Sequence, residues 1–304
     1  MNVLITGGSG LIGTHFANML RGRGYDVALL SRTKSKGTEF PIYTWDTDKN
    51  EIELEAIEWC DYIIHLAGVN IGDKRWSKKR KLLIINSRVK SIQLLFEKIM
   101  KLKPNIKAFI TSSAIGYYGT MPADKIFNET DPAGNDFLAE TCRLWEDAAD
   151  QFKDAGIRTV KIRTGIVLSM VGGAFKKMLL PVKLGLGSPL GSGKQAISWI
   201  HVEDLCSIYL KAIEDIKMEG AYNAVTPDYK TNQELTKTLA RVLHKPFWFP
   251  RVPSFLLKLI FGEMSAIILK GNPVSANKIT TAGFKFMFPD LESALKNLLL
   301  NTKP

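Results

Sequence analysis

The sequence has few cysteines and histidines, and neither kind is grouped. The three cysteines, Cys60, Cys142 and Cys206, lie far apart and form no C-x-x-C pair. Their spacing indicates neither a disulfide framework nor a zinc site. The four histidines form no H-x-x-x-H pair either. We therefore predict reduced cysteines, structural histidines and no metal site.

Long apolar runs are also lacking, and no leader peptide is expected. The most apolar late stretch, residues 255–269, is interrupted by Lys258, Gly262 and Glu263, and it falls short of the ~20 apolar residues that a bilayer span needs. The sequence opens directly on an apolar segment, which leaves no room for a basic, cleavable leader. These patterns predict a cytoplasmic protein with no membrane partner.

Acidic residues are in the minority, with 30 against 41 basic residues and a formal net charge of +11. The densest basic cluster is KRWSKKRK at residues 74–81. A nucleic-acid-binding protein would gather such residues on one face, interleaved with aromatic side chains, whereas here the excess is spread over several expected helices. We expect no nucleic-acid partner and interpret the excess as a solvated surface that attracts anionic small molecules.

A glycine-rich turn stands at the start of the sequence. In MNVLITGGSGLIG an apolar segment, residues 3–6, runs directly into Gly7, Gly10 and Gly13. The first glycine allows a sharp turn, the second lets a pyrophosphate approach the backbone, and the third lets the next helix pack closely on the sheet. The helix would point its free N–H groups at the phosphates. Strand, glycines and helix together predict a dinucleotide-binding site.

Strand and helix patterns alternate through the first two thirds of the sequence. Helices are expected near residues 12–23, 78–101, 137–155 and 202–213, and apolar strands near residues 27–30, 42–45, 62–66, 108–112, 159–163 and 222–225. Apolar strands joined by helices indicate a parallel sheet covered on both faces. The predicted fold class is α/β, a Rossmann-type doubly wound parallel sheet.

The pattern changes after Pro227. A helix is expected near residues 232–244, followed by Pro246, Pro250 and Pro253 and then by short helical segments. We predict a nucleotide-binding domain over residues 1–225 and a smaller, mainly helical cap over residues 226–304, to which the glycine-rich residues 165–195 contribute. Such a cap would enclose a substrate beside the cofactor.

The second expected strand lacks an acidic residue at its end. An NAD site usually carries one about twenty positions past the glycine turn, where it holds the ribose 2′-OH. Here the strand ends at Ser31 and Arg32, followed by Lys34 and Lys36. A guanidinium beside a hydroxyl suits a 2′-phosphate, so we predict NADP(H). The alternative is that these cations belong to a solvated loop.

Further motifs carry a family resemblance. TGGSGLIG, HLAG at 65–68, TSSAIGYYG at 111–119 and WIHVEDL at 199–205 resemble the extended short-chain dehydrogenase/reductase family. RW at 75–76, SR at 87–88 and LPxxLGLGxPxGSG at 180–193 resemble its atypical branch of epimerase family proteins, whose C-terminal domain is uncharacterised. The resemblance implies an NADP-binding Rossmann domain with cofactor contacts at Gly7, Gly10, Leu11, Ile12, Gly13, Ser31, Arg32, Leu66, Ala67, Gly68, Arg88, Ser112 and Arg163.

The family's Tyr-x-x-x-Lys pair is absent. Its chemistry uses a tyrosine as acid/base, a lysine one helical turn later to lower the tyrosine pKa, and a serine to hold the substrate oxygen. No tyrosine of this sequence is followed four residues later by lysine, and Leu138 and Cys142 stand roughly where the pair would be. The serine is present as Ser113 or its neighbour Ser112.

Substitutes for the missing acid/base can be proposed. Tyr118 or Tyr117, just beyond the strand that carries the serine, could present a phenol to the site, and packing in the core is the alternative for both. Glu140 lies on the correct helix and could act as an acid if buried, or be solvated. We interpret Cys142 as a small buried hydrophobe and His201 as a structural histidine.

Two functions remain open. The leading hypothesis is an NADP(H)-dependent oxidoreductase or epimerase-like enzyme acting on a small carbonyl or sugar-like substrate. In it Ser113 orients the substrate oxygen and Tyr118 transfers the proton. The other is an NADP(H)-binding regulatory or sensor protein without turnover. Besides the small-molecule substrate, a homodimer is the partner to be considered.

Overall fold

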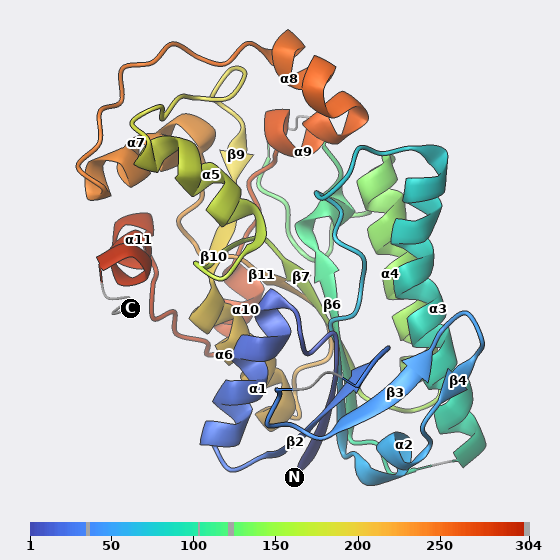
Figure 1. The fold of residues 1–304 in the computed structure, drawn as a ribbon. Helices are drawn as coiled ribbons and strands as arrows, with labels where there is room; N and C mark the ends of the chain where they lie inside the picture. Colours follow the sequence, from blue (N-terminus) through green and yellow to red (C-terminus); the bar gives the residue numbers. More distant parts are fainter. Residues whose placement is uncertain (35–36, 103, 121–124, 301–304) are drawn as a thin grey trace.

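The computed structural model describes residues 1–34, 37–102, 104–120 and 125–300 (Figure 1). Its central sheet contains β1 (Asn2–Thr6), β2 (Asp26–Ser31), β3 (Ile42–Asp46), β4 (Glu51–Ile52), β5 (Tyr62–His65), β6 (Ala108–Ala114), β7 (Thr159–Thr164) and β11 (Gly220–Ala224). The spatial order is β11-β7-β6-β5-β1-β2-β3-β4, and every pairing is parallel except β3 with β4. The chain therefore winds outward in both directions from β1.

Helices cover both faces of this sheet (Figure 1). One face carries α1 (Leu11–Gly22) and α6 (Val202–Glu214), and the other carries α2 (Glu55–Trp59), α3 (Lys78–Leu102) and α4 (Phe137–Asp154). Along β1, Val3 and Ile5 belong to the apolar core shared with α1 and α6, whereas Leu4 belongs to the core under α3 and α4. Because both faces are covered, the central strands β1 and β5 are apolar over most of their length.

The predicted α/β class and its Rossmann-type sheet are confirmed. Expected elements agree with observed ones to within a few residues. The largest differences are at the ends of elements, because the position of an end depends on one or two residues only. Besides β4, four short strands lie outside the prediction: β8 (Ile166–Leu168), β9 (Ala196–Ile197), β10 (Trp199–His201) and β12 (Lys230–Thr231). They pair as β8 with β10 and β9 with β12. Segments of two or three residues are too short to show a period of two.

A third core lies in the cap. It joins α5 (Gly173–Lys183), α7 (Asn232–Val242) and α11 (Leu291–Leu300) through side chains such as Phe175, Leu235 and Leu295. Side chains between residues 166 and 182, within the predicted 165–195 contribution, therefore share an apolar core with α11. By contrast, α10 (Asn277–Thr281) packs on β11, and its Ile279 belongs to the sheet core.

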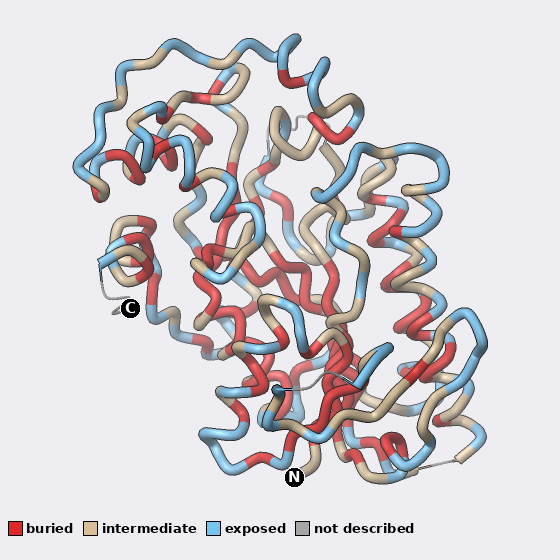
Figure 2. Tube along the Cα trace, in the orientation of Figure 1, coloured by how far each residue is buried: buried red, intermediate tan, exposed pale blue. Residues whose placement is uncertain are grey.

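The remaining short helices form one end of the molecule. These are α8 (Ser254–Phe261), the 3-10 turn η2 (Gly262–Ser265) and α9 (Ala266–Leu269), which lie far from the amino terminus (Figure 1). Buried residues concentrate in the sheet and on the inner sides of its helices, whereas the segment leading into α8 is largely exposed (Figure 2). Within the described ranges, no helix is long and apolar enough to cross a bilayer.

Candidate functional site

The glycine turn after β1 is packed tightly against its neighbours. Gly7 has a φ of +69°, and a Cβ added there would lie 2.8 Å from the carbonyl carbon of Leu66, just after β5. A Cβ on Gly13 would press on the Gly7 carbonyl oxygen and lie 2.6 Å from the Gly8 Cα. Both positions therefore require glycine: the first for its backbone conformation and close approach, the second for close approach alone.

The amino terminus of α1 opens on this turn. Gly10 is the N-cap residue, and no side chain caps the helix. The first turn of α1 contains no acidic residue, and its first N–H groups, at Leu11, Ile12 and Gly13, have no acceptor within the helix. An uncapped helix start with its positive dipole end is suited to a phosphate.

The turn lies where the strand order reverses, between β1 and β5. In an open α/β sheet this reversal forms the crevice in which ligands bind. The Thr6 hydroxyl oxygen accepts hydrogen bonds from the N–H groups of Leu66 and Ala67, at 3.2 and 3.1 Å. The predicted Leu66, Ala67 and Gly68 are thus brought beside the glycine turn.

The end of β2 carries a cation that has no acidic partner among the described residues. Ser31 is half-buried at the end of the strand and Arg32 is exposed. Within the described part of the chain Arg32 forms no ion pair, whereas Lys34 lies 3.1 Å from the Glu53 carboxylate. Lys36 lies outside the described residues. Contact of Ser31 and Arg32 with a 2′-phosphate stays a prediction.

Arg88 of α3 is a second cation without a carboxylate among the described residues. Its Nη1 donates to the carbonyl oxygens of Val69 and Ile84, at 3.1 and 2.9 Å, and its guanidinium packs 4.8 Å from the centre of the Trp145 ring. A Cβ on Gly68 would lie 3.1 Å from the Arg88 Cζ. Burial lowers the pKa of Arg88 to about 10. Arg88 is half-buried, and a partly desolvated cation that pairs with no carboxylate of the described residues is stabilised when an anion binds beside it.

Ser113 lies at the end of β6, facing α4. Its hydroxyl donates to the Glu146 carboxylate at 2.7 Å, and Arg163 of β7 binds the same carboxylate through Nε and Nη2, at 2.8 and 2.9 Å. All three side chains are almost fully buried. Burial opposes the charge of Arg163, but the Glu146 carboxylate raises its pKa above the ordinary value. Because an ionised carboxylate only accepts, the Ser113 hydroxyl must donate to it.

Tyr118 extends the same network towards the sheet edge. Its hydroxyl donates to Asn223 Oδ1 of β11 at 2.7 Å and accepts from Arg163 Nη1 at 3.1 Å. The Tyr118 side chain is buried and its ring stacks on Phe127. Burial, opposed by Arg163, raises the pKa of Tyr118 to about 12. The phenol is therefore enclosed by protein partners, and its role in proton transfer stays a prediction.

The other predicted site residues fall on either side of this network. Ser112, next to Ser113 on the strand, is buried and points to the opposite face of β6. Tyr117 lies under the Arg163 guanidinium, 3.5 Å from its Cζ to the ring centre. The guanidinium nitrogens of Arg163 thus donate to Glu146 and Tyr118. Contact of Ser112 or Arg163 with a cofactor stays a prediction.

Leu138 and Cys142 occupy the inner face of α4. The helix begins at Phe137 because Asp136 caps it, accepting from the N–H groups of Leu138 and Ala139. A Cβ on Gly116, just after β6, would lie 3.4 Å from the Leu138 Cβ and 3.7 Å from the Cys142 Sγ. Burial raises the pKa of the Cys142 thiol to about 12, so it is a neutral, buried group. Glu140, on the same helix, is exposed.

Two family models match the sequence. The model of the NAD dependent epimerase/dehydratase family matches residues 3–225, and that of a domain of unknown function, DUF1731, matches residues 252–298. This chain belongs to the NAD dependent epimerase/dehydratase family. The predicted resemblance to extended short-chain dehydrogenases/reductases of the epimerase branch is thereby confirmed.

Relatives match this epimerase-family chain over its whole length. Epimerase family protein YfhF of Bacillus subtilis is 37% identical over 100% of this chain and 99% of its own length. The crystal structure of human epimerase family protein SDR39U1 with NADPH has a TM-score of 0.88 and 34% identity, over 99% of this chain and 100% of the human one. A nucleoside-diphosphate sugar epimerase from Corynebacterium glutamicum has a TM-score of 0.79 and 30% identity, over 98% of this chain and 58% of that one. The cofactor predicted from Ser31 and Arg32 is the one in the human relative's crystal structure.

Glu146 and Asn223 are site residues that the sequence reasoning on this epimerase-family chain missed. Leu138, Cys142 and Glu146 are spaced four residues apart, so a helix places them on one face. That spacing could have marked Glu146 as a carboxylate facing the end of β6. Asn223 gave no such signal, because its contact with Tyr118 joins residues 105 positions apart.

A buried histidine makes the stability of the epimerase fold depend on pH. His65, at the end of β5, is fully buried between Ser91 and Thr111, at 2.8 and 3.3 Å. Burial, together with the nearby Arg88 charge, lowers the pKa of His65 to about 3. The native ring stays neutral where the unfolded ring, with its ordinary pKa near 6.5, is charged.

We expect the free energy of unfolding to fall as the pH drops from about 6.5 towards 3, because the unfolded chain then binds a proton that the native chain does not. The slope approaches about 1.4 kcal/mol per pH unit for this histidine. Urea unfolding at several pH values measures it, and His65→Gln should flatten the slope whereas the exposed His244→Asn should not. An unchanged slope in His65→Gln would contradict the assignment.

Proposed function

We propose that this chain binds NADP(H) and uses it as an oxidoreductase or epimerase-like enzyme on a small carbonyl or sugar-like substrate. The observation that carries the cofactor part is a pair of cations without carboxylate partners in the described residues, Arg32 and Arg88, on either side of an uncapped helix start. Three separate elements thus offer positive charge to one crevice. A dinucleotide with an additional phosphate matches that arrangement.

The residues at the crevice fit such a group. The N–H groups of Leu11, Ile12 and Gly13 would hold the pyrophosphate, which can approach because Gly10 has no Cβ. Ser31 and Arg32 would hold the 2′-phosphate. When bound, NADP(H) supplies or accepts a hydride at its nicotinamide ring.

Ser113 would orient the oxygen of the substrate. Because its proton is directed to Glu146 at 2.7 Å, its oxygen offers lone pairs and accepts a hydrogen bond. We therefore infer that the form of the substrate that contacts Ser113 is the one that presents a hydroxyl, a sugar hydroxyl or the alcohol from which a carbonyl is formed. Tyr118 would supply the proton relay, with Arg163 joining its hydroxyl to the Glu146 carboxylate.

A second function, NADP(H) binding without turnover, is favoured by a specific observation. Leu138 and Cys142 fill the helix face where the acid/base pair of the family would stand, and the Tyr118 phenol is enclosed by Asn223 and Arg163. A protein of this kind would respond to its cofactor by a change of conformation or partner.

Calorimetry with NADPH, followed by a turnover assay over carbonyl compounds and nucleotide sugars, separates these functions. Binding with turnover, lost in Ser113→Ala and Tyr118→Phe but kept in the exposed control Tyr229→Phe, supports the enzyme. Binding without any turnover favours the regulatory protein. No binding of NADPH or NADP⁺ overturns both.

We expect Arg32→Ala to weaken NADPH binding about 10- to 100-fold while NADH binding changes little. The loss corresponds to one charge-assisted contact with the 2′-phosphate, about 1.5–3 kcal/mol. Calorimetry with both coenzymes measures it. Arg23→Ala removes a comparably exposed cation beyond the far end of α1 and serves as the control. Equal losses for NADPH and NADH would contradict the assignment of Arg32 to the 2′-phosphate.

A further inference from the structure

The segment that leads into and forms α8 is unusually apolar for an exposed part of the chain. Residues 244–261, HKPFWFPRVPSFLLKLIF, follow the upper edge of the molecule from the end of α7 to α8 (Figure 1). We call these residues the cap rim. Most of the cap rim is exposed to solvent (Figure 2).

One face of α8 presents large apolar side chains to solvent. Phe255 is 72% exposed, Leu259 71% and Ile260 52%, whereas Leu257 is 6% exposed and anchors the helix. Phe255 and Leu259 are four residues apart and share one side of the helix, and Ile260, the next residue, extends the exposed apolar surface to the adjacent side. Trp248, in the loop before α8, is 69% exposed. Exposed apolar side chains grouped in this way are typical of a surface that binds another protein or a membrane.

The cap rim carries positive charge and no acidic residue. Between Glu234 and Glu263 the sequence contains no aspartate or glutamate, while Lys245, Arg251 and Lys258 lie within the cap rim. Glu263 itself is paired with Lys81. The cap rim therefore adds a local positive field to its apolar surface.

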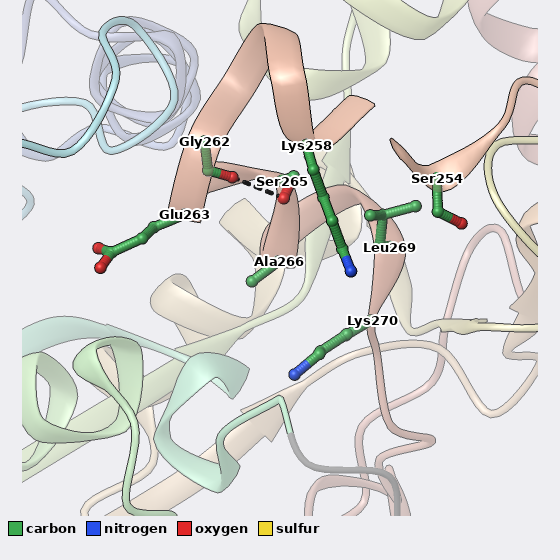
Figure 3. Close-up of a pocket in the computed structure, with 8 residues that line it drawn as sticks. All are labelled: Ser254, Lys258, Gly262, Glu263, Ser265, Ala266, Leu269 and Lys270. Atoms are coloured by element: carbon green, nitrogen blue, oxygen red, sulfur yellow. Dashed lines mark hydrogen bonds between the residues drawn. The ribbon is translucent and has the colours of Figure 1, made fainter. Parts of the chain in front are cut away.

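Two lysines line a pocket beside α8. The pocket has a volume of about 490 Å³ and lies between α8, η2 and α9. The ammonium groups of Lys258 and Lys270 are directed into it (Figure 3). Neither lysine pairs with a carboxylate of the described ranges. An anionic group held near the cap rim would meet both.

We propose that the cap rim docks on the surface of an anionic phospholipid bilayer. Exposed Trp, Phe, Leu and Ile side chains next to Lys and Arg, without acidic residues, are the composition of an interfacial membrane segment. The apolar face of α8 would enter the headgroup region, and the basic residues would lie near the anionic lipid phosphates. In this proposal the chain binds to the surface of the bilayer and does not span it. The proposal therefore differs from the expectation of no membrane partner, and it agrees with the lack of a spanning helix in the described residues.

The charge of the cap rim argues against a second copy of this chain as its occupant. A two-fold contact places the same surface on both sides. Lys245, Arg251 and Lys258 of both copies would then gather in one interface with no acidic residue in the cap rim to balance them. An anionic bilayer satisfies both the apolar and the charged residues.

Sedimentation of the full chain with vesicles tests the proposal. Phosphatidylcholine vesicles with and without phosphatidylserine are compared at low and high salt. We expect binding only with the anionic vesicles, weakening as salt rises. Emission from the exposed Trp248 should shift to shorter wavelength on binding, and Trp248→Phe should remove the shift.

The double variant Phe255→Ser with Leu259→Ser should weaken vesicle binding about tenfold or more, because two large apolar groups no longer leave water. Both side chains are exposed, so the thermal midpoint should stay unchanged. Ile216→Ser, at a 79% exposed position outside the cap rim, is the matched control and should bind as the parent does.

Three results would overturn the proposal. The first is no sedimentation with anionic vesicles, and the second is equal binding by the parent and the double variant. The third is concentration-dependent self-association in solution that the double variant abolishes, which would assign the cap rim to a second copy of the chain.

Discussion

Replacing Gly13 with alanine is expected to abolish detectable NADPH binding and to lower the free energy of unfolding by about 3 kcal/mol. The added Cβ would press on the Gly7 carbonyl oxygen and lie 2.6 Å from the Gly8 Cα. These are backbone atoms, which cannot rotate away as a side-chain end can. Relief requires α1 to move away from β1, and this movement displaces the N–H groups that face the phosphates.

The same helix offers a matched control. Gly22, the last residue of α1, has no atom within 4 Å of an added Cβ. Gly22→Ala should leave NADPH binding unchanged and alter stability by no more than about 1 kcal/mol, in the stabilising direction. Calorimetry and urea unfolding measure both variants. Tight binding by Gly13→Ala would mean that the glycine turn is not the cofactor cradle.

Replacing Glu146 with leucine is expected to lower the free energy of unfolding by about 3–5 kcal/mol. The substitution leaves the Arg163 guanidinium buried without its carboxylate and removes the acceptor of the Ser113 hydroxyl. Breaking a buried pair costs more than the pair contributes, because one desolvated charge remains. Glu146→Gln keeps the shape and one acceptor oxygen, so a smaller loss is expected.

Asp147→Ala, at the next position of α4, is the control for this loss. It removes the exposed Arg143–Asp147 pair at 2.9 Å, which is worth no more than about 0.5 kcal/mol. Urea unfolding of the three variants at neutral pH gives the comparison. A loss in Glu146→Leu no greater than that of Asp147→Ala would show that Arg163 finds another partner or that water reaches the pair.

Short-range sequence patterns were sufficient to predict the glycine turn and the sheet. Gly7, Gly10 and Gly13 follow an apolar strand directly, so local spacing alone carries the signal. The strands of a sheet covered on both faces are continuous apolar runs, which a single sequence shows clearly. The lack of an acidic residue near Ser31 and Arg32 was likewise enough to indicate NADP(H).

The polar network of Ser113, Glu146 and Arg163 depends on long-range packing. Ser113, Glu146 and Arg163 come from β6, α4 and β7, and their hydrogen bonds join residues 33 and 17 positions apart. Both Glu146 and Arg163 are of residue types that are usually solvated. A sequence pattern does not reveal that two charges are buried together, since burial depends on what the rest of the chain places over them.

By itself the sequence determined the Rossmann-type fold and membership of the epimerase family, and it predicted a phosphorylated dinucleotide, because these depend on neighbouring residues and on repeated spacing. Only the tertiary structure decided that the Tyr118 phenol is enclosed, that Arg88 lacks a carboxylate partner in the described chain and that the apolar face of α8 is left to solvent. Each of these depends on which distant groups fold against a side chain, and that is a property of three-dimensional packing.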